Sequence, residues 1–166
     1  MSGWLAGKRV NIEGDSPAIV EAFEAAGASL VEGEADIWVH VAAPPATKAA
    51  HDLNHAEWRA SLDVGLDRRF LGAKDFAASC RTRGQGGVVL FVGHPEQALG
   101  ADQAAAAGAL GNLTKTLGVE WARDGIRVNT ILTRETGDTL GHLAAYLASD
   151  YAAYVTGAVM GIAHGD

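Results

Sequence analysis

The stretch QAAAAGAL at residues 103–110, which runs on to WARDGIRVN at residues 121–129, decides the fold of this chain. Its alanine-rich first part predicts a helix over about residues 102–123, because alanine is the strongest helix former. Asp124 and Gly125 then form a turn, and the apolar residues after them predict a strand over residues 126–132. A long helix that leads through a tight turn into a buried strand is typical of an α/β protein.

The rest of the chain repeats this alternation. Ser16 and Pro17 are typical of a helix start, and Gly27 of a helix end. Asn54 and Glu57 have the spacing of a capping box. Helices that alternate with apolar strands predict one α/β domain over residues 1–166, with a parallel sheet covered by helices on both faces. Its further strands are expected at residues 8–12, 36–42, 88–92 and 158–162, and its further helices at residues 66–81 and 140–148.

Composition excludes several classes of function. A formal net charge of −7 argues against a nucleic-acid surface, which needs clustered Lys and Arg. Cys80 is the single cysteine, so neither a disulfide framework nor a thiolate metal site is expected. No apolar run reaches the roughly 18 residues of a membrane span, and the first residues lack the apolar region of a signal peptide. We therefore expect a soluble cytoplasmic protein.

Several stretches resemble the short-chain dehydrogenase/reductase family nearly end to end. The most specific are GIRVNTI at residues 125–131 and YLASDYAAYVTG at residues 146–157, which are similar to the last two strands of that family and their connection. WRASLDVGL at residues 58–66 resembles the helix that holds the catalytic asparagine, and GGVVLFVG at residues 86–93 resembles the strand that ends in the catalytic serine. The resemblance implies a Rossmann-like sheet of about five strands, reduced from the fold of that family.

The cofactor turn departs from the family pattern. The family holds the cofactor pyrophosphate on a turn with three glycines, but here the turn reads Glu13, Gly14, Asp15, and its carboxylates oppose phosphate charge. Only eight residues separate Gly27 from Asp36, whereas a parallel strand with its crossover needs a dozen or more. We therefore expect the second and third strands of the family to be missing, the strand at residues 8–12 to lie near a sheet edge, and no NAD(P) cofactor to bind.

The catalytic positions depart as well. The resemblance places the asparagine of the family at Gly65, its serine at Gly93 (or at His94 if the register shifts by one), and its tyrosine and lysine at Gln103 and Ala107. In that family the tyrosine exchanges a proton with the substrate and the lysine lowers the pKa of the tyrosine. Glutamine is no acid near neutral pH, and alanine carries no charge. The sequence therefore predicts that the catalytic set of the family is absent.

The other reactive side chains favour structural roles. His51 and His55 are four residues apart but have no nearby third ligand, so we expect no metal site. His40 lies in a buried strand and is expected to be a hydrogen-bonded core residue. His94 is expected in a solvated loop, and Cys80 shows no activating partner. Three carboxylates are expected to form a solvated connection: Glu32, Glu34 and Asp36.

Two hypotheses of different classes follow from the resemblance. The first is a non-catalytic subunit that supports an active short-chain dehydrogenase in a hetero-oligomer, through residues 66–83, 101–123 and 140–162, which resemble the subunit contacts of that family. A self-associating binding protein would differ from it only in the partner. The alternative is a cofactor-independent isomerase, lyase or cyclase that uses the old active-site cleft near His94, with Asp102 and Gln103.

Overall fold

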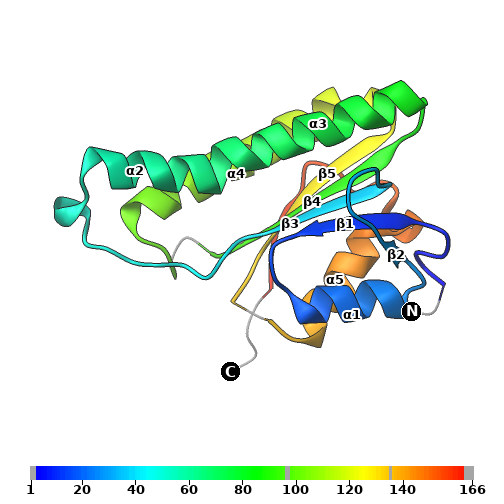
Figure 1. Cartoon of the computed structure of the whole chain (residues 1–166), viewed down its shortest axis with the longest axis horizontal. Coiled ribbons are helices and arrows are strands. Elements are labelled where there is room, and N and C mark those ends of the chain that lie inside the picture. The colour runs from blue at the N-terminus through cyan, green and yellow to red at the C-terminus, as the bar shows by residue number, and fades with distance from the viewer. Residues whose placement is uncertain (1–2, 96–97, 135, 163–166) are drawn as a thin grey trace.

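The chain folds around a twisted parallel sheet (Figure 1). The structure is a computed structural model that describes residues 3–95, 98–134 and 136–162. Among these residues the strand order is β2-β1-β3-β4-β5-β6, and every neighbouring pair is parallel. The strands are β1 (Arg9–Glu13), β2 (Ser29–Leu30), β3 (Ile37–Val41), β4 (Gly87–Gly93), β5 (Ile126–Leu132) and β6 (Val159–Gly161). The predicted class, a parallel sheet with helices on both faces, is confirmed.

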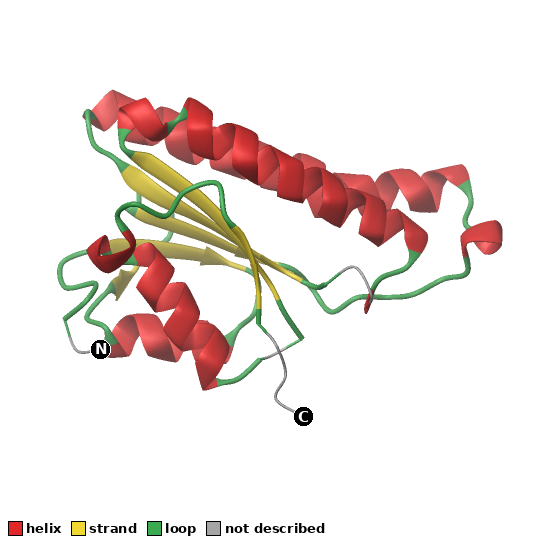
Figure 2. Cartoon of the chain, turned by 180° about the vertical axis from the view of Figure 1, so that it is seen from behind, coloured by secondary structure: helices red, strands yellow, loops and turns green. Residues whose placement is uncertain are grey.

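Two layers of helices cover the sheet (Figure 2). Helices α1 (Pro17–Ala25) and α5 (Asp138–Ala148) cover one face, and the long helices α3 (Arg68–Arg83) and α4 (Ala101–Glu120) cover the other. Helix α2 (His55–Leu62) leads into α3 through a π-helical turn, η2 (Asp63–Asp67). Three short 3₁₀ turns complete the described elements: η1 (Ala50–Asp52), η4 (Ala122–Asp124) and η5 (Asp150–Ala152).

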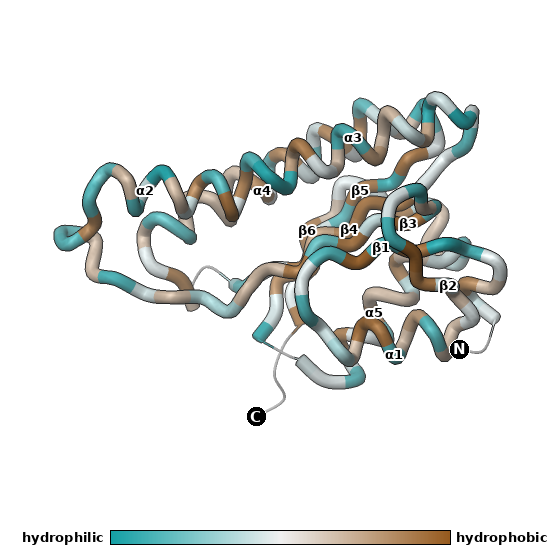
Figure 3. Tube along the Cα trace, in the orientation of Figure 1, coloured by the Kyte–Doolittle hydropathy of each residue, from teal (hydrophilic) through white to brown (hydrophobic). Residues whose placement is uncertain are grey.

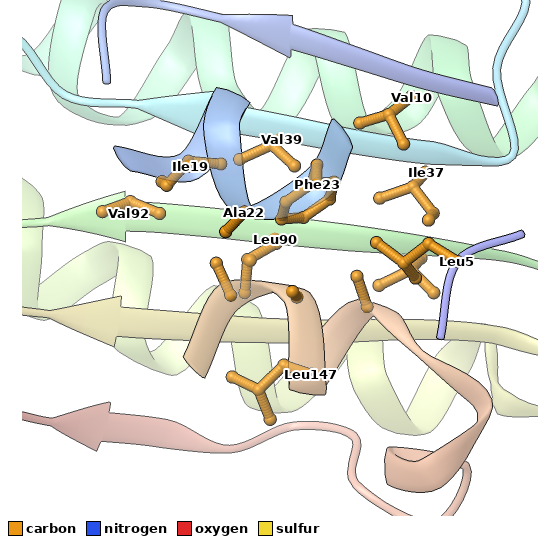
Figure 4. Packing of buried hydrophobic residues seen from close by; sticks show 14 of the residues in the cluster. Leu5, Val10, Ile19, Ala22, Phe23, Ile37, Val39, Leu90, Val92 and Leu147 are labelled. Atoms are coloured by element: carbon orange, nitrogen blue, oxygen red, sulfur yellow. The ribbon is translucent and has the colours of Figure 1, made fainter. Parts of the chain in front are cut away.

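Each helix layer has its own apolar core. Alternate residues of a strand point to opposite faces, so Leu90 of β4 packs with Phe23 of α1 while the adjacent Phe91 packs under α3 and α4. Figure 4 shows the first core, where Ile19 and Phe23 face Val39 and Leu90. Figure 3 shows strongly hydrophobic stretches in β3 and β4, whereas hydrophilic and less polar residues alternate along α2.

Two predicted helix ends are built differently. The capping box at α2 is confirmed: the Glu57 amide donates to Asn54 Oδ1 at 3.0 Å, and the Asn54 amide donates to Glu57 Oε2 at 3.0 Å. Ser16 is the N-cap residue of α1, but its side chain makes no capping hydrogen bond, and Pro17 takes the first helical position. The π turn before α3 joins it to α2 as one continuous helical stretch.

The second strand is present, contrary to the sequence prediction. Gly27 ends α1 with a φ of +92°, and the Ala28 amide donates to the Phe23 carbonyl at 3.0 Å, which turns the chain back at once. Ser29 and Leu30 then pair in parallel with Arg9 and Val10. This two-residue strand needs little chain and raises the strand count to six. It covers only the first two residues of β1, and no described residue between it and β3 forms a further strand.

The acidic connection before β3 is also not simply solvated. Asp36 accepts hydrogen bonds from the Arg9 amide at 2.9 Å and from Arg9 Nη2 at 2.9 Å, and Arg83 Nη1 lies 3.3 Å from its Oδ1. Glu34 reaches Arg9 at 3.7 Å from a more exposed position. Asp36 therefore joins β1 to the end of α3. Among the described residues, no helix combines the length and the apolarity that a membrane crossing requires.

Candidate active-site pocket

A pocket of about 320 Å³ opens at the carboxyl ends of β3 and β4, against η2 and α4. Its volume lies at the small end of the range of ligand sites. The carboxyl ends of parallel strands are where α/β sheets bind ligands. Gly65, Gly93, His94, Gln103 and Ala107 all line it. The structure thus brings together, from η2, β4, the loop after β4 and α4, every position that the resemblance assigns to the catalytic set.

The two glycines of this set differ in their surroundings: Gly65 lies in a tight contact, and Gly93 has room for a Cβ atom at ordinary contact distance. A Cβ atom on Gly65 would lie 2.8 Å from the Cβ atom of Ala106, because η2 carries its backbone against α4. A Cβ atom on Gly93 would lie 3.5 Å from Nη1 of Arg69 and 3.5 Å from Leu132. A larger side chain does not fit at Gly65 without movement, and at Gly93 a guanidinium group lies directly beside the backbone.

Arg69 is a lining residue that the sequence analysis missed. It projects from the first turn of α3, is only 5% exposed, and Nη2 donates to the Val92 carbonyl at 3.3 Å. Among the described residues, its Nε has no hydrogen-bond partner, and no ion pair includes the guanidinium. Burial lowers the pKa of Arg69 to about 10, so the group stays charged at neutral pH. Its position four residues after Gly65, on the same helical face, was the available signal.

His40 is not the hydrogen-bonded core residue that was expected. It lies near the end of β3, lines the pocket, and its Nδ1 finds no partner within the described part of the chain. Its ring centre lies 5.9 Å from that of Trp38. Burial, aided by the positive charge of Arg69, lowers the pKa of His40 to about 4. The imidazole is therefore neutral at pH 7 and adds no second cation.

The remaining polar groups lie around the mouth of the pocket and the start of α4. Nε2 of His94 lies 3.1 Å from the carbonyl oxygen of Ala43, so His94 connects the loops that follow β3 and β4. Gln103 lines the pocket, and its buried Oε1 has no partner among the described residues. Asp102 is buried and accepts a hydrogen bond from the Ser61 hydroxyl, but it is not a lining residue.

The turn between β1 and α1 does not fit a dinucleotide pyrophosphate. Gly14 has a φ of +101°, and a Cβ atom there would overlap the carbonyl oxygen of Val41, so the turn lies directly on the end of β3. The Glu13 carboxylate accepts a hydrogen bond from Trp38 Nε1 at 2.9 Å, and Asp15 is exposed beside it. Pro17 supplies no N–H at the helix start. Two carboxylates and a missing donor thus stand where phosphate needs backbone donors.

The other candidate residues lie away from this pocket. His51 is in η1, 3.8 Å from its neighbour Asp52, and His55 begins α2. The described residues contain no group of three His, Cys, Asp or Glu that could hold a metal ion. Cys80 does have a partner, since Arg83 Nη2 donates to its Sγ at 3.5 Å, but burial dominates and raises the pKa of the thiol.

Comparisons with known proteins agree with this architecture. The family described as enoyl-(acyl carrier protein) reductase matches residues 10–136. The chain is 30% identical to 3beta-hydroxysteroid dehydrogenase 1 of Eggerthella lenta over 161 aligned positions, which cover 77% of this chain and 62% of the relative. It is 28% identical to a galactitol 2-dehydrogenase (L-tagatose-forming) of Cereibacter sphaeroides, with 84% of this chain and 70% of the relative covered. The chain thus spans about two thirds of the length of these relatives.

Solved structures share the fold. A short-chain type dehydrogenase/reductase from Mycobacterium marinum superposes with a TM-score of 0.86 at 21% identity, over 95% of this chain and 94% of that one. An oxidoreductase of the same type from Burkholderia thailandensis gives a TM-score of 0.81 at 22% identity, over 93% and 91% of the two chains. At this identity the likeness establishes the fold alone.

Proposed function

This chain belongs to the short-chain dehydrogenase/reductase family, and we propose that it is a non-catalytic member of it. In this proposal the chain binds no NAD(P) itself and associates with a catalytically complete short-chain dehydrogenase, which it supports. The observation that supports the proposal is the single pocket lined by Gly65, Gly93, Gln103 and Ala107, the residues that the resemblance assigns to the catalytic positions.

These four residues do not supply the functional groups that the chemistry of the family needs. Two glycines contribute no functional group, and an alanine at position 107 supplies no charge to lower a neighbouring pKa. The amide of Gln103 neither gives nor takes a proton near neutral pH, so hydride transfer would lack its general acid. The acidic turn at Glu13 and Asp15 supports the same conclusion for the cofactor.

The outward face of α4 supports a role in subunit contact. Its exposed residues between the helix start and Val119 are mostly small and uncharged, and Val119 is itself 79% exposed. In the same layer, α3 exposes Phe70 and Leu71, the latter to 49%. Small residues allow close approach of a second helix, and exposed apolar side chains gain from burial. Residues 66–83 and 101–123 are therefore the proposed primary contact, with residues 140–162 as a second one.

Co-expression tests the association directly. The tagged chain should co-purify with a complete short-chain dehydrogenase from the same organism and elute with it in size-exclusion chromatography. Ala105→Glu places a charge on the exposed face of α4 and should weaken co-purification about tenfold or more. Ala25→Glu is the matched control, because Ala25 is equally an exposed helical alanine but lies in α1 on the opposite layer. Equal recovery with both variants, or no complex at all, would overturn the proposal.

The cofactor claim has its own test. Titration of the purified chain with NADH should leave the nucleotide fluorescence unchanged, because the β1–α1 turn offers carboxylates where the pyrophosphate needs donors. Micromolar binding would contradict a cofactor-free subunit, whatever the result of the co-expression.

A cofactor-independent enzyme is the second candidate. The open pocket favours it, because a pocket of this kind at the carboxyl ends of the strands has room for a small substrate. His94 and Gln103 line the pocket and are its candidate residues. Turnover, without nucleotide, of a compound that binds in the pocket would establish this candidate, provided that His94→Gln abolishes it. Binding without turnover would leave the subunit role.

A further inference from the structure

The pocket holds a buried positive charge for which the described residues supply no counter-ion. Arg69 is 5% exposed, and its hydrogen bond to the Val92 carbonyl is long at 3.3 Å. It belongs to none of the ion pairs among the described residues. A buried charge is costly unless it is paired and hydrogen-bonded. Lowering of the Arg69 pKa to about 10 does not relieve this cost by deprotonation at neutral pH. The described residues therefore leave the positive charge of Arg69 uncompensated, and an anion bound in the pocket would compensate it.

The space beside this charge is open. Nη1 of Arg69 would lie 3.5 Å from a Cβ atom on Gly93, so the absence of a side chain at Gly93 leaves the guanidinium facing the pocket. The other walls are mainly apolar and come from the loop after β3, from η2 and from α4: Ala42, Pro44, Val64, Leu99, Ala107 and Leu110. One end of the pocket is thus cationic and the rest suits a compact apolar body.

We propose that this pocket binds a small organic carboxylate, whose two oxygens pair with the guanidinium of Arg69 and whose apolar body lies against the alanine, proline and leucine walls. The planar fork of a guanidinium matches the two oxygens of a carboxylate. One cation balances one negative charge, and His40 is neutral at pH 7, so a doubly charged phosphate would be left half-compensated. The free Nδ1 of His40 and Oε1 of Gln103 offer polar contacts for a further substituent on the ligand.

This binding site does not rest on association with a dehydrogenase partner, and its test needs only the chain by itself. Isothermal titration calorimetry compares benzoate with benzamide, which has nearly the same shape but no charge. We expect benzoate to bind at least about tenfold more tightly than benzamide, because the buried charge is compensated only by the carboxylate. Equal affinities, or no benzoate binding, would overturn the proposal.

Two variants assign the binding to this pocket. Arg69→Met keeps an unbranched side chain but removes the charge, and it should abolish the preference for benzoate over benzamide. Ala107→Leu fills the pocket from α4 without touching Arg69, and it should remove binding of both probes. Far-UV circular dichroism checks that each variant folds. If Arg69→Met fails to fold, Ala107→Leu still decides the location, and unchanged benzoate binding there would place the site elsewhere.

Glu96→Gln tests whether the chain supplies its own anion. Glu96 lies outside the described residues, three positions after Gly93. Benzoate binding that is the same in the wild type and in Glu96→Gln supports an external carboxylate. Binding that arises only in Glu96→Gln would show that a side chain of the protein already pairs with Arg69, and it would overturn the proposal.

Discussion

A single carboxylate, Asp36, connects the start of β1 with the end of α3. Hydrogen bonding from the Arg9 side chain lowers the pKa of Asp36, with Arg83 contributing a smaller effect. Asp36→Asn removes the charge but keeps the shape, so we expect the free energy of unfolding at neutral pH to fall by roughly 1–3 kcal/mol. Urea denaturation followed by circular dichroism measures the difference. Asp75→Asn is the control, because its carboxylate is 74% exposed and pairs only with the adjacent Lys74.

The pH dependence of this effect has a definite sign. Because the folded-state pKa of Asp36 lies below its ordinary value of 3.8, its contribution is fully present above pH 3.8 and is lost as the pH falls through the lowered folded value. The stability difference between wild type and Asp36→Asn should therefore shrink in acid, whereas that of Asp75→Asn should stay near zero throughout. A cost that is independent of pH would mean that the shape of the side chain, and not its charge, matters.

Residues of the site differ in how far the sequence reveals them. Gly65, Gly93, Gln103 and Ala107 were singled out by motifs that run along one element each, and all four line the same pocket. Arg69 was missed, because its spacing from Gly65 places it on the pocket side of the helix but does not show that it is buried, whereas the neighbouring Arg68 is exposed and pairs with Asp63 at 2.8 Å. Its burial, without an ion-pair partner among the described residues, arises only when α3 packs on the ends of β3 and β4.

At the level of elements, α5 approaches α1 closely at one glycine. A Cβ atom on Gly141 would overlap the backbone carbonyl oxygen of Ala18 and lie 2.9 Å from the Cβ atom of Ala22. Gly141→Ala should therefore lower the free energy of unfolding by about 1–3 kcal/mol despite the better helix propensity of alanine. Gly111→Ala in α4 is the matched control, since its Cβ would meet only Val159 at 3.9 Å, and it should stabilise by about 0.5–1 kcal/mol.

Thermal unfolding of the two glycine variants measures both effects, and the signs are expected to be opposite. If both variants gained stability, helix propensity would outweigh the packing of α5 on α1, and the short distance between these helices would not be essential.

Elements with a clear apolar pattern were predicted well, whereas the two-residue strand β2 was not. The strand at residues 126–132 was predicted with its observed bounds, because seven residues with apolar side chains at most alternate positions follow the turn at Asp124 and Gly125. Strand β2 consists of only two residues, both of them exposed, which is too few to show any alternation. Its pairing with β1 depends on the direction in which the turn at Gly27 leads the chain. The helix expected over residues 102–123 ends at Glu120, and η4 takes up its last turn.

The whole molecule should unfold as one cooperative unit, because both helix layers pack on the same sheet. Phe23 of α1 and Phe91 of β4 are fully buried in opposite layers, yet Phe91 is adjacent to Leu90, which packs with Phe23. Phe23→Leu and Phe91→Leu should each lower the free energy of unfolding by about 1–2 kcal/mol. Trp38 and Trp121 lie in the α3/α4 layer, whereas Trp4 packs against the other core and Trp58 lies in α2. In a background with Trp4→Phe and Trp58→Phe, fluorescence therefore reports on the α3/α4 layer, whereas far-UV circular dichroism reports on all helices.

In Phe23→Leu the two signals separate the possible outcomes. A single cooperative domain requires that the tryptophan transition shifts as far as the circular dichroism transition, although the substitution lies on the opposite face of the sheet. The same coincidence is expected for Phe91→Leu, which serves as the reciprocal control. A fluorescence midpoint that stays at its wild-type value in Phe23→Leu would show that the α1/α5 layer unfolds by itself, and that the sheet does not transmit stability from one layer to the other.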